Sequence, residues 1–373
     1  MRDKTRLPFI DKIVLWLNCF FCFALLISYL APVVDPRKAW LIAFFGLAYP
    51  LLVVGCIIFI VYWLFRKPWY ASVSLITIAL GWGILKNNVA FHSSSNDPLK
   101  PKDNGTIRMM TYNVHNFKRY GAKNDTSTKK EILQIINAQQ PDIIGFQEFY
   151  SRNHGQYDML DSLVKIMGSA YYYFKPIFFN RTEAIGIAIF SKYPIIRMGT
   201  IPISDTKSEN ACLYIDVKKD NKEFRVYSVH LQSIRFDPED YKYLSEVSAQ
   251  GKTDMSSTRR LGSKLKIAFI KRSIQVDKIK KHAAQCPYPY IISGDFNDTP
   301  TSYTVNQMSK GLKNAFREKG FGFGRTYNGD FPNYQIDYIM VSPQFDVDNY
   351  TVIEKRLSDH YPVRSDLILS DRP

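Results

Sequence analysis

Three long runs without a charged side chain fall within the first 91 residues of the chain. They cover residues 13–34, 39–65 and 68–85, and no comparable run follows. The hydrocarbon core of a bilayer is about 30 Å thick and requires roughly 20 apolar residues in a helix. The first two runs are therefore long enough to span a membrane, and the third is barely long enough. We expect residues 1–91 to form three transmembrane helices, the alternative being buried helices of a soluble core.

The basic residues beside these runs predict the orientation of the chain. Lys and Arg next to a span tend to stay in the cytoplasm. Here they precede the first run and separate the second from the third, at Arg2, Lys4, Arg6, Lys12, Arg66 and Lys67. With three spans, the rest of the chain is then extracytoplasmic, although further basic residues between 86 and 108 weaken this bias. We expect an integral membrane protein, in the inner membrane if the source is bacterial.

Beyond the third run, the pattern becomes that of a mixed α/β domain over residues 107–370. Residues 92–106 are polar and rich in Ser, Pro and Asn, which predicts a linker. Short apolar runs then alternate with amphipathic segments. Strands are predicted at 107–117, 142–147, 171–176, 184–191, 211–217, 224–231, 290–293, 336–341 and 363–369, and helices between 127 and 141, at 157–167 and at 257–284. The polar segment 233–258 is longer than an ordinary connection, which is typical of a lid, a binding loop or disorder.

Charge narrows the choice of partners. The chain has a net charge of +15, and residues 105–373 hold 38 basic and 29 acidic residues, a net charge of about +9. A basic domain favours polyanionic partners such as nucleic acid or anionic lipid headgroups, although a solvated basic surface without such a partner is as common. The same region contains Cys212 and Cys286, and the sequence leaves open whether they pair. No protein partner can be inferred.

Polar side chains of the kind that bind a cation or a phosphate stand at the ends of several predicted strands. Asn113, Glu148 and His230 each follow a short apolar run. In the segment GDFN, Asp295 and Asn297 are two residues apart, which places both side chains on one face of an extended chain. A metal ion or an activated water molecule could meet both.

The segment SDHYP places Asp359 beside His360 near the C-terminus. Neighbours in a strand point apart, so both can serve one site only at a turn, and the following Tyr-Pro pair supports one. A set of oxygen ligands from Asn113, Glu148 and Asp359, without closely spaced Cys or His, suits Mg²⁺, with Mn²⁺ as the alternative, rather than Zn²⁺. Taken singly, each of these residues also has an ordinary structural role, as a helix cap, a core histidine or a surface charge.

Taken together and in this order, the motifs resemble those of the endonuclease/exonuclease/phosphatase superfamily. The matching segments are TYNVHNF, QE, SKYP, SVHLQ, GDFND, QIDYI and SDHYP, and they extend over residues 107–370. The resemblance implies a DNase I-like, four-layer α/β sandwich, in which two mixed β-sheets pack face to face with helices outside. The site would lie at one end, between the sheets.

The resemblance also implies how the oxygen-bearing residues are used. Glu148 would bind the metal ion, and Asp359 and Asn113 would complete its coordination directly or through water. Asp295 would orient and deprotonate the attacking water molecule. Asn297 would position that water molecule or a phosphate oxygen.

Two histidines are implied as phosphate ligands. His230 and His360 would hydrogen-bond the phosphate and stabilise its developing charge. In this family each histidine is paired with a carboxylate that fixes its tautomer. Asp337, in the segment QIDYI, would serve His360, and Glu183, which precedes the SKYP strand, is the candidate for His230, with a plain surface glutamate as the alternative.

Fold and site indicate hydrolysis of phosphoester bonds but leave the substrate open. The first choice is a nuclease, because the domain is basic and His230 with Glu183 resembles the DNase I-like branch. The second is a hydrolase of phospholipid headgroups, similar to a sphingomyelinase or a phosphoinositide phosphatase, because three spans would keep the site near a bilayer. The third is a membrane receptor that uses the fold as a binding module without catalysis. The expected partners are thus nucleic acid or phospholipid as substrate, and the lipid bilayer itself.

Overall fold

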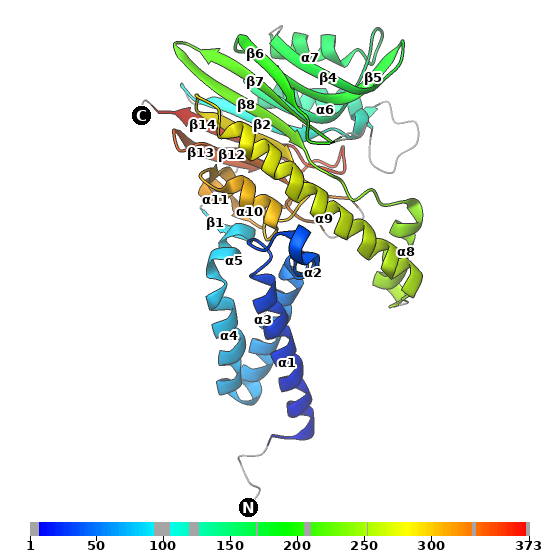
Figure 1. Cartoon of the computed structure of the whole chain (residues 1–373), viewed down its shortest axis with the longest axis vertical. Helices are drawn as coiled ribbons and strands as arrows, with labels where there is room; N and C mark the ends of the chain where they lie inside the picture. Colours follow the sequence, from blue (N-terminus) through cyan, green and yellow to red (C-terminus); the bar gives the residue numbers. More distant parts are fainter. Residues whose placement is uncertain are drawn as a thin grey trace, which may run out of the picture.

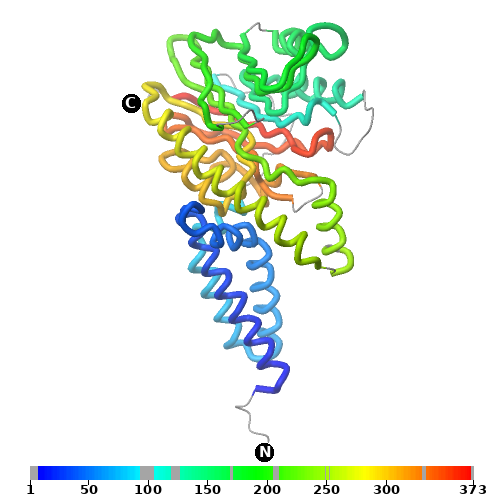
Figure 2. The backbone as a smooth tube through the Cα atoms, turned by 45° about the vertical axis from the view of Figure 1, so that its right-hand side comes forward, coloured from blue at the N-terminus to red at the C-terminus, as the bar shows by residue number. Residues whose placement is uncertain are grey.

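The computed structural model describes residues 7–92, 105–118, 127–168, 171–204, 210–251, 253–329 and 333–370. A bundle of helices from the first part of the chain stands below an α/β domain (Figure 1). The first helix begins at the end of the bundle that is far from the α/β domain, as both backbone views show (Figure 2). Most of the expected linker, 92–106, lies outside the described residues.

The bundle contains two helices that are long and apolar enough to cross a membrane. Its helices are α1 (Phe9–Ser28), α2 (Pro36–Leu47), α3 (Tyr49–Arg66), η1 (Pro68–Tyr70), α4 (Ala71–Leu80) and α5 (Trp82–Asn88). The two candidate spans are α1, with 20 residues, and α3, with 18. At the third expected span, Pro68–Leu80 and α5 are bent by 69° to each other, the geometry of either a broken span or a re-entrant loop. Three transmembrane helices are therefore not confirmed.

Two breaks divide the apolar runs. The second run is interrupted at Ala48. Pro50 lacks a backbone N–H and is tolerated only in the first turn of a helix, so a new helix, α3, starts at Tyr49. The third run is interrupted at Gly81, where a Cβ would lie 2.2 Å from the ring of Tyr29. The hydroxyl of Tyr29 donates to the carbonyl of Thr77 at 2.8 Å. The tyrosine thus packs into the bend.

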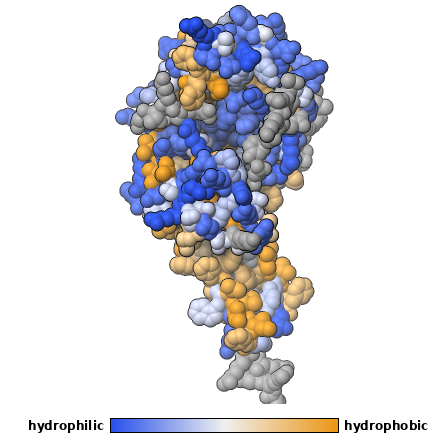
Figure 3. Space-filling model, turned by 90° about the vertical axis from the view of Figure 1, so that its right-hand side faces the viewer, coloured by the Kyte–Doolittle hydropathy of each residue, from blue (hydrophilic) through white to orange (hydrophobic). Residues whose placement is uncertain are grey.

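The bundle exposes its apolar side chains and buries polar ones. Trp16, Leu51 and Phe65 are 79%, 66% and 85% exposed, and apolar colour dominates this part of the surface in Figure 3. Inside, Ser74 donates to the side chain of Asn18 at 2.6 Å, and both are fully buried. A water-soluble domain shows the opposite distribution.

Two mixed, six-stranded sheets build the α/β domain. Their orders are β10-β12-β9-β8-β7-β6 and β13-β14-β2-β3-β5-β4. One pair in each is parallel, β8 with β9 and β2 with β3, and the other pairs are antiparallel. The strands are β2 (Ile107–Asn113), β3 (Ile143–Arg152), β4 (Tyr171–Phe179), β5 (Glu183–Ser191), β6 (Ile195–Ile201), β7 (Ala211–Lys219), β8 (Lys222–His230), β9 (Tyr290–Asp295), β10 (Lys313–Asn314), β12 (Asp337–Val341), β13 (Phe345–Val352) and β14 (Val363–Leu369).

The sheets pack face to face with helices outside. The core between them joins Ile143 of one sheet to Leu213 and Val226 of the other. Helices α6 (Ser127–Gln139) and α7 (Met159–Met167) bury their apolar faces against the second sheet. Helices α9 (Met255–Ala283) and α10 (Tyr303–Ser309) cover the first. The expectation of an α/β fold with two mixed sheets is confirmed.

The polar segment 233–258 differs from its prediction, since it contains helix α8 (Pro238–Gln250) rather than only a loop. Asp237 and Asp240 form a capping box at its start, and Gly251 ends it in the left-handed conformation. The buried carboxylate of Asp240 is 2.7 Å from Arg260 of α9.

Strands β6 and β13 were also not predicted. Cys212 and Cys286 are free thiols.

The remaining short elements lie at the edges of the α/β domain. They are η2 (His115–Phe117), α11 (Ala315–Lys319), and a small sheet of β1 (Ala90–Phe91) and β11 (Phe321–Gly322). The pairing of β1 with β11 fixes the end of the helical part against the α/β domain.

Candidate active site

Strand ends bring the predicted polar residues to one edge of the two sheets. Asn113 ends β2, and His230 and Asp295 end the parallel neighbours β8 and β9, where they are register partners. Asp337 begins the adjacent β12 opposite Asp295. Because parallel strands end at the same edge of a sheet, side chains far apart in the sequence meet there.

Asp295 lies at the centre of the site and is 1% exposed. Its Oδ1 accepts from the backbone N–H of Asn297 at 2.8 Å, and its Oδ2 accepts from the side-chain amides of Asn297 at 3.1 Å and Asn113 at 3.2 Å. The Nε2 atoms of His230 and His360 are 3.6 and 3.7 Å from the same Oδ2. Burial raises the pKa of Asp295 from 3.8 to about 6, although the charge of His360 acts to lower that pKa. The result is an unusually basic carboxylate within a ring of donors.

The backbone explains the segment GDFN. Gly294 has a φ of +140°, and a Cβ there would lie 2.0 Å from the carbonyl oxygen of Val229 on β8, so only glycine fits. Asn297 has a φ of +53°, in the left-handed region that asparagine tolerates. Its side-chain amide also donates to the carbonyl of Leu231 at 3.1 Å. This turn directs the side chain of Asn297 back to Asp295.

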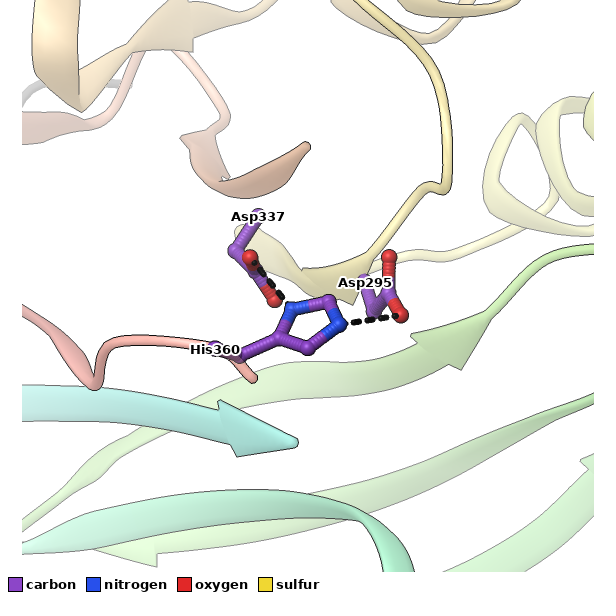
Figure 4. A group of neighbouring side chains, drawn as sticks. All are labelled: Asp295, Asp337 and His360. Carbon is purple, nitrogen blue, oxygen red and sulfur yellow. Dashed lines mark hydrogen bonds and ion pairs between the residues drawn. The ribbon is translucent and has the colours of Figure 1, made fainter. Parts of the chain in front are cut away.

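His360 lies between two carboxylates. Its Nδ1 is hydrogen-bonded to Oδ2 of Asp337 at 2.9 Å, and Asp295 is on the opposite side of the ring (Figure 4). Burial lowers the pKa of His360, but the charges of Asp337 and Asp295 outweigh it and raise that pKa well above its usual value. The protonated imidazolium is therefore favoured at neutral pH.

His230 has no comparable carboxylate. It is 1% exposed, and neither ring nitrogen has a hydrogen-bond partner among the described residues. The structure does not bring Glu183 to it. Glu183 is the register partner of Arg152, and its carboxylate accepts from the hydroxyl of Tyr150 at 2.6 Å and from Arg152 at 3.3 Å. His230 is instead one of the residues that line the cavity at the site.

Two further carboxylates converge beside Asp295. Oε2 of Glu148 and Oδ1 of Asp359 are 3.4 and 3.7 Å from Nδ1 of His115, and the side-chain amide of Asn113 donates to Glu148 at 3.3 Å. Burial alone would raise the pKa of Glu148, but the hydrogen bond from His115 and the nearby histidine charges lower it to about 2. Burial lowers the pKa of His115, but Glu148 and Asp359 outweigh it and raise that pKa, so the predicted metal ligands already contact an imidazole that favours its protonated form. His115 was not predicted, although it stands within the motif TYNVHNF.

The geometry offers two positions for a cation. Asp295, Asp337 and His360 each present a ligand atom within 4.8 Å of the others, so this buried group could hold a metal ion. However, His360 and Asp337 are bound to each other, and a metal there would require a neutral imidazole and the loss of that hydrogen bond. Glu148, Asp359 and Asn113 supply hard oxygen ligands. The side chain of Glu148 is 21% exposed and that of Asp359 is 15% exposed. The second position fits a hydrated divalent cation better.

A cavity of about 220 Å³ joins these groups. Seven of the nine predicted residues line it, and Asp337 and Glu183 do not. Its lining also includes Arg272 of α9, which is 1% exposed and places Nε 3.4 Å from Oδ2 of Asp298. Sequence reasoning missed Arg272, because it lies in a long amphipathic helix among many other basic residues.

Comparisons of the sequence agree with this geometry. The profile of the endonuclease/exonuclease/phosphatase family matches residues 110–360, which is more than half of the chain. The profile of a domain of unknown function matches residues 11–88, the helical part. A comparison with curated proteins gave no match.

Solved structures share the fold of the α/β domain. An endonuclease/exonuclease/phosphatase from Beutenbergia cavernae aligns with a TM-score of 0.52 and 19% identity, over 71% of this chain and 72% of that one. A family protein from Leptotrichia buccalis has a TM-score of 0.49 and 16% identity, over 70% and 99%. The catalytic domain of human Nocturnin has a TM-score of 0.49 and 16% identity, over 72% and 97%. The first alignment supports the fold, and none of them identifies a substrate.

Proposed function

Because the chain belongs to the endonuclease/exonuclease/phosphatase family, we propose that it is a membrane-anchored hydrolase that cleaves phosphoester bonds with a divalent metal ion. The observation that carries this proposal is the convergence of amide and imidazole donors on Oδ2 of Asp295, beside a second cluster of carboxylates. Phosphoester hydrolysis needs both the donors around Asp295 and the second carboxylate cluster. The substrate is anionic and repels a nucleophile until its charge is neutralised.

Asp295 acts as the base. Its pKa of about 6 leaves it ionised at neutral pH, yet more basic than an ordinary aspartate. It accepts a proton from a water molecule as the oxygen of that molecule attacks phosphorus, and the bond from phosphorus to the leaving oxygen breaks. The leaving oxygen takes up a proton from solvent. The two hydrogen bonds from Asn297 keep the carboxylate oriented for this transfer.

The histidines and amides bind the phosphate. His360, held as an imidazolium by Asp337, stabilises the charge on a non-bridging oxygen. His230 has unsatisfied ring nitrogens in the cavity and supplies a second donor. Removing one such donor from an oxyanion site typically costs about 10²–10³-fold in turnover.

Glu148, Asp359 and Asn113 would hold the metal ion. A bound Mg²⁺ or Mn²⁺ supplies positive charge that polarises the phosphoryl group. His115 lies beside both carboxylates, with Nδ1 at 3.4 Å from Glu148 and 3.7 Å from Asp359. His115 would therefore share this corner of the site with the ion.

The helical part anchors the protein. Helices α1 and α3 meet the length and hydropathy of membrane spans, and their large apolar side chains are exposed rather than packed. The orientation expected from the basic residues places the catalytic domain outside the cytoplasm.

The proposal is tested with the full-length protein in detergent and Mg²⁺. Bis(p-nitrophenyl) phosphate and p-nitrophenyl phosphate report cleavage of a diester and a monoester by release of nitrophenolate. Hydrolysis of either that stops with EDTA and returns with Mg²⁺ or Mn²⁺ is the expected result. Binding without turnover on both esters, in every metal, would make the domain a binding module instead.

A further inference from the structure

The cavity at the site has an apolar side to which the helical part of the chain contributes. Five of its lining residues, which we call the apolar wall, are Leu47, Ile234, Leu265, Phe269 and Ile336. Leu47 is the last residue of α2, Leu265 and Phe269 belong to α9, and the other two lie in connections of the α/β domain. A pocket that only had to bind phosphate would not need such a surface.

The apolar wall is fixed in place by contacts between α2 and α9. The rings of Phe44 and Phe269 meet edge to face at 5.3 Å. Lys266 lies over the ring of Trp40 at 4.7 Å. Closest to the cavity, the hydroxyl of Tyr334 donates to the backbone carbonyl of Leu47 at 3.1 Å. The helical part and the catalytic domain therefore build one pocket together.

An exposed apolar stripe continues from the apolar wall along the bundle. Its residues lie on α3 at intervals of three or four positions from one another, which places them on one face of that helix. They are Leu51, Val54, Ile58, Val61 and Phe65, with exposed fractions of 66%, 54%, 61%, 49% and 85%. The first of them, Leu51, is four residues beyond Leu47, across the break at Ala48. The cavity residue Leu47 thus stands two residues before the helix whose exposed apolar side chains would face lipid.

The charges around the cavity do not suit a long polyanion. Four acidic residues line it, Glu148, Asp295, Asp298 and Asp359, against two arginines, Arg235 and Arg272. One of these arginines is already 3.4 Å from Asp298. Proteins that follow a nucleic-acid backbone place several Lys or Arg side chains on successive phosphates. The lining instead suits one phosphate group, with a metal ion to balance the carboxylates.

We propose that the natural substrate is a membrane amphiphile, in which the scissile phosphoester is attached to a long aliphatic chain that lies on the apolar wall and the α3 stripe. This inference rests on the proposed function. The bilayer delivers the substrate laterally, the catalytic residues receive the phosphate, and the chain remains in contact with apolar side chains. Burial of each methylene group against such a surface favours the long-chain ester over its short-chain analogue.

The test compares p-nitrophenyl phosphodiesters that differ only in their second alcohol, methyl, hexyl or dodecyl. Full-length protein in nanodiscs is assayed with Mg²⁺ for kcat/KM on each ester, and with a DNA oligonucleotide as a competing substrate class. We expect kcat/KM to rise from methyl to dodecyl by about tenfold or more. The Leu47→Ser variant should reduce this dodecyl-to-methyl ratio by about fivefold. Leu41→Ser, which removes a side chain of α2 that is 58% exposed and does not line the cavity, is the matched control and should leave the ratio unchanged.

The outcomes separate the two proposals. Metal-dependent hydrolysis with equal kcat/KM for all three esters would overturn the amphiphile inference and leave the proposed function standing. Preferential cleavage of DNA would overturn it in favour of a nuclease. An equal loss of ratio in Leu41→Ser and Leu47→Ser would trace the preference to the nanodisc rather than the pocket, and would overturn it as well. Failure to cleave any of these substrates would remove the proposed function and this inference with it.

Discussion

The two sides of the cavity are built in different ways. The polar side (Asn113, Glu148, His230, Asp295, Asn297, Asp359 and His360) comes from strand ends and turns of the α/β domain, and its groups are fixed by hydrogen bonds to one another. The apolar wall comes partly from the helical region, through Leu47, and is fixed by packing. The polar side determines which bond can be cleaved. The apolar wall determines what else the substrate must contain.

The largest effect should come from Asp295→Asn, which breaks the polar side at its centre. An amide cannot accept the proton of the attacking water, so turnover of every ester should fall by about 10²–10⁴-fold. The variant should remain folded, because asparagine is nearly isosteric. Bis(p-nitrophenyl) phosphate hydrolysis measures the loss, and circular dichroism checks the fold.

Asp161→Asn is the control for this substitution, since Asp161 is 54% exposed, pairs with Lys165 on α7 and does not line the cavity. It should retain wild-type turnover. Near wild-type hydrolysis by Asp295→Asn would exclude the carboxylate as the base.

The next effect separates the two possible cation positions within the polar side. Glu148→Gln removes a ligand of the proposed site, and should raise the Mg²⁺ concentration for half-maximal activity by about 10-fold or more. Asp337→Asn should lower turnover with little change in that concentration, because its role is to hold His360 protonated. Titrations of both variants with Mg²⁺ measure the concentration that gives half-maximal activity. The reverse pattern would place the ion between Asp295, Asp337 and His360.

The pH dependence of stability should show the cost of burying Asp295. Its pKa rises from 3.8 to about 6 on folding, so the folded state binds this proton more tightly than the unfolded state. Stability from this group is present below its unfolded pKa and is lost as pH rises towards 6. Without metal, Asp295→Asn should therefore be more stable than wild type above about pH 6, and this gain should shrink towards pH 4. Thermal unfolding in EDTA at a series of pH values measures it, and a pH-independent difference would contradict the assignment.

The smallest effect concerns the apolar wall. Tyr334→Phe removes the hydrogen bond to the carbonyl of Leu47, which should cost about 1 kcal/mol of stability. Tyr173→Phe, which removes a hydroxyl contact with Thr200 away from the cavity, is the matched control. Hydrogen exchange should increase around residue 47 in the first variant alone. If both variants leave that region protected, the contact does not hold the helical region to the catalytic domain.

The two sides also differ in how far the sequence predicts them. The polar side was largely predictable, because its residues stand at strand ends in short motifs, and the backbone demands of Gly294 and Asn297 fix the local sequence. Glu183 was misplaced, since its position on β5 is set by pairing with Arg152 rather than by the site. His115 stood unnoticed within a matched motif.

The apolar wall could not be predicted. Leu47 stands in an apolar run where every residue suits a lipid environment, and only tertiary packing brings it to the cavity. The same holds for Phe269 and Arg272, since an amphipathic helix shows which face is buried but not what lies against it. The break at Ala48, which follows from Pro50, was the one local signal that this run is more than a span.

The most direct test of the central claim follows the oxygen atom of the attacking water. Full-length protein with Mg²⁺ is allowed to hydrolyse bis(p-nitrophenyl) phosphate in water enriched in heavy oxygen, and both products are analysed by mass spectrometry. The account predicts that the label enters the phosphate product alone, and that this labelled product forms about 10²–10⁴-fold more slowly when Asp295 is replaced by Asn. Label in the nitrophenol, or formation of the labelled phosphate product by the variant at the wild-type rate, would contradict it.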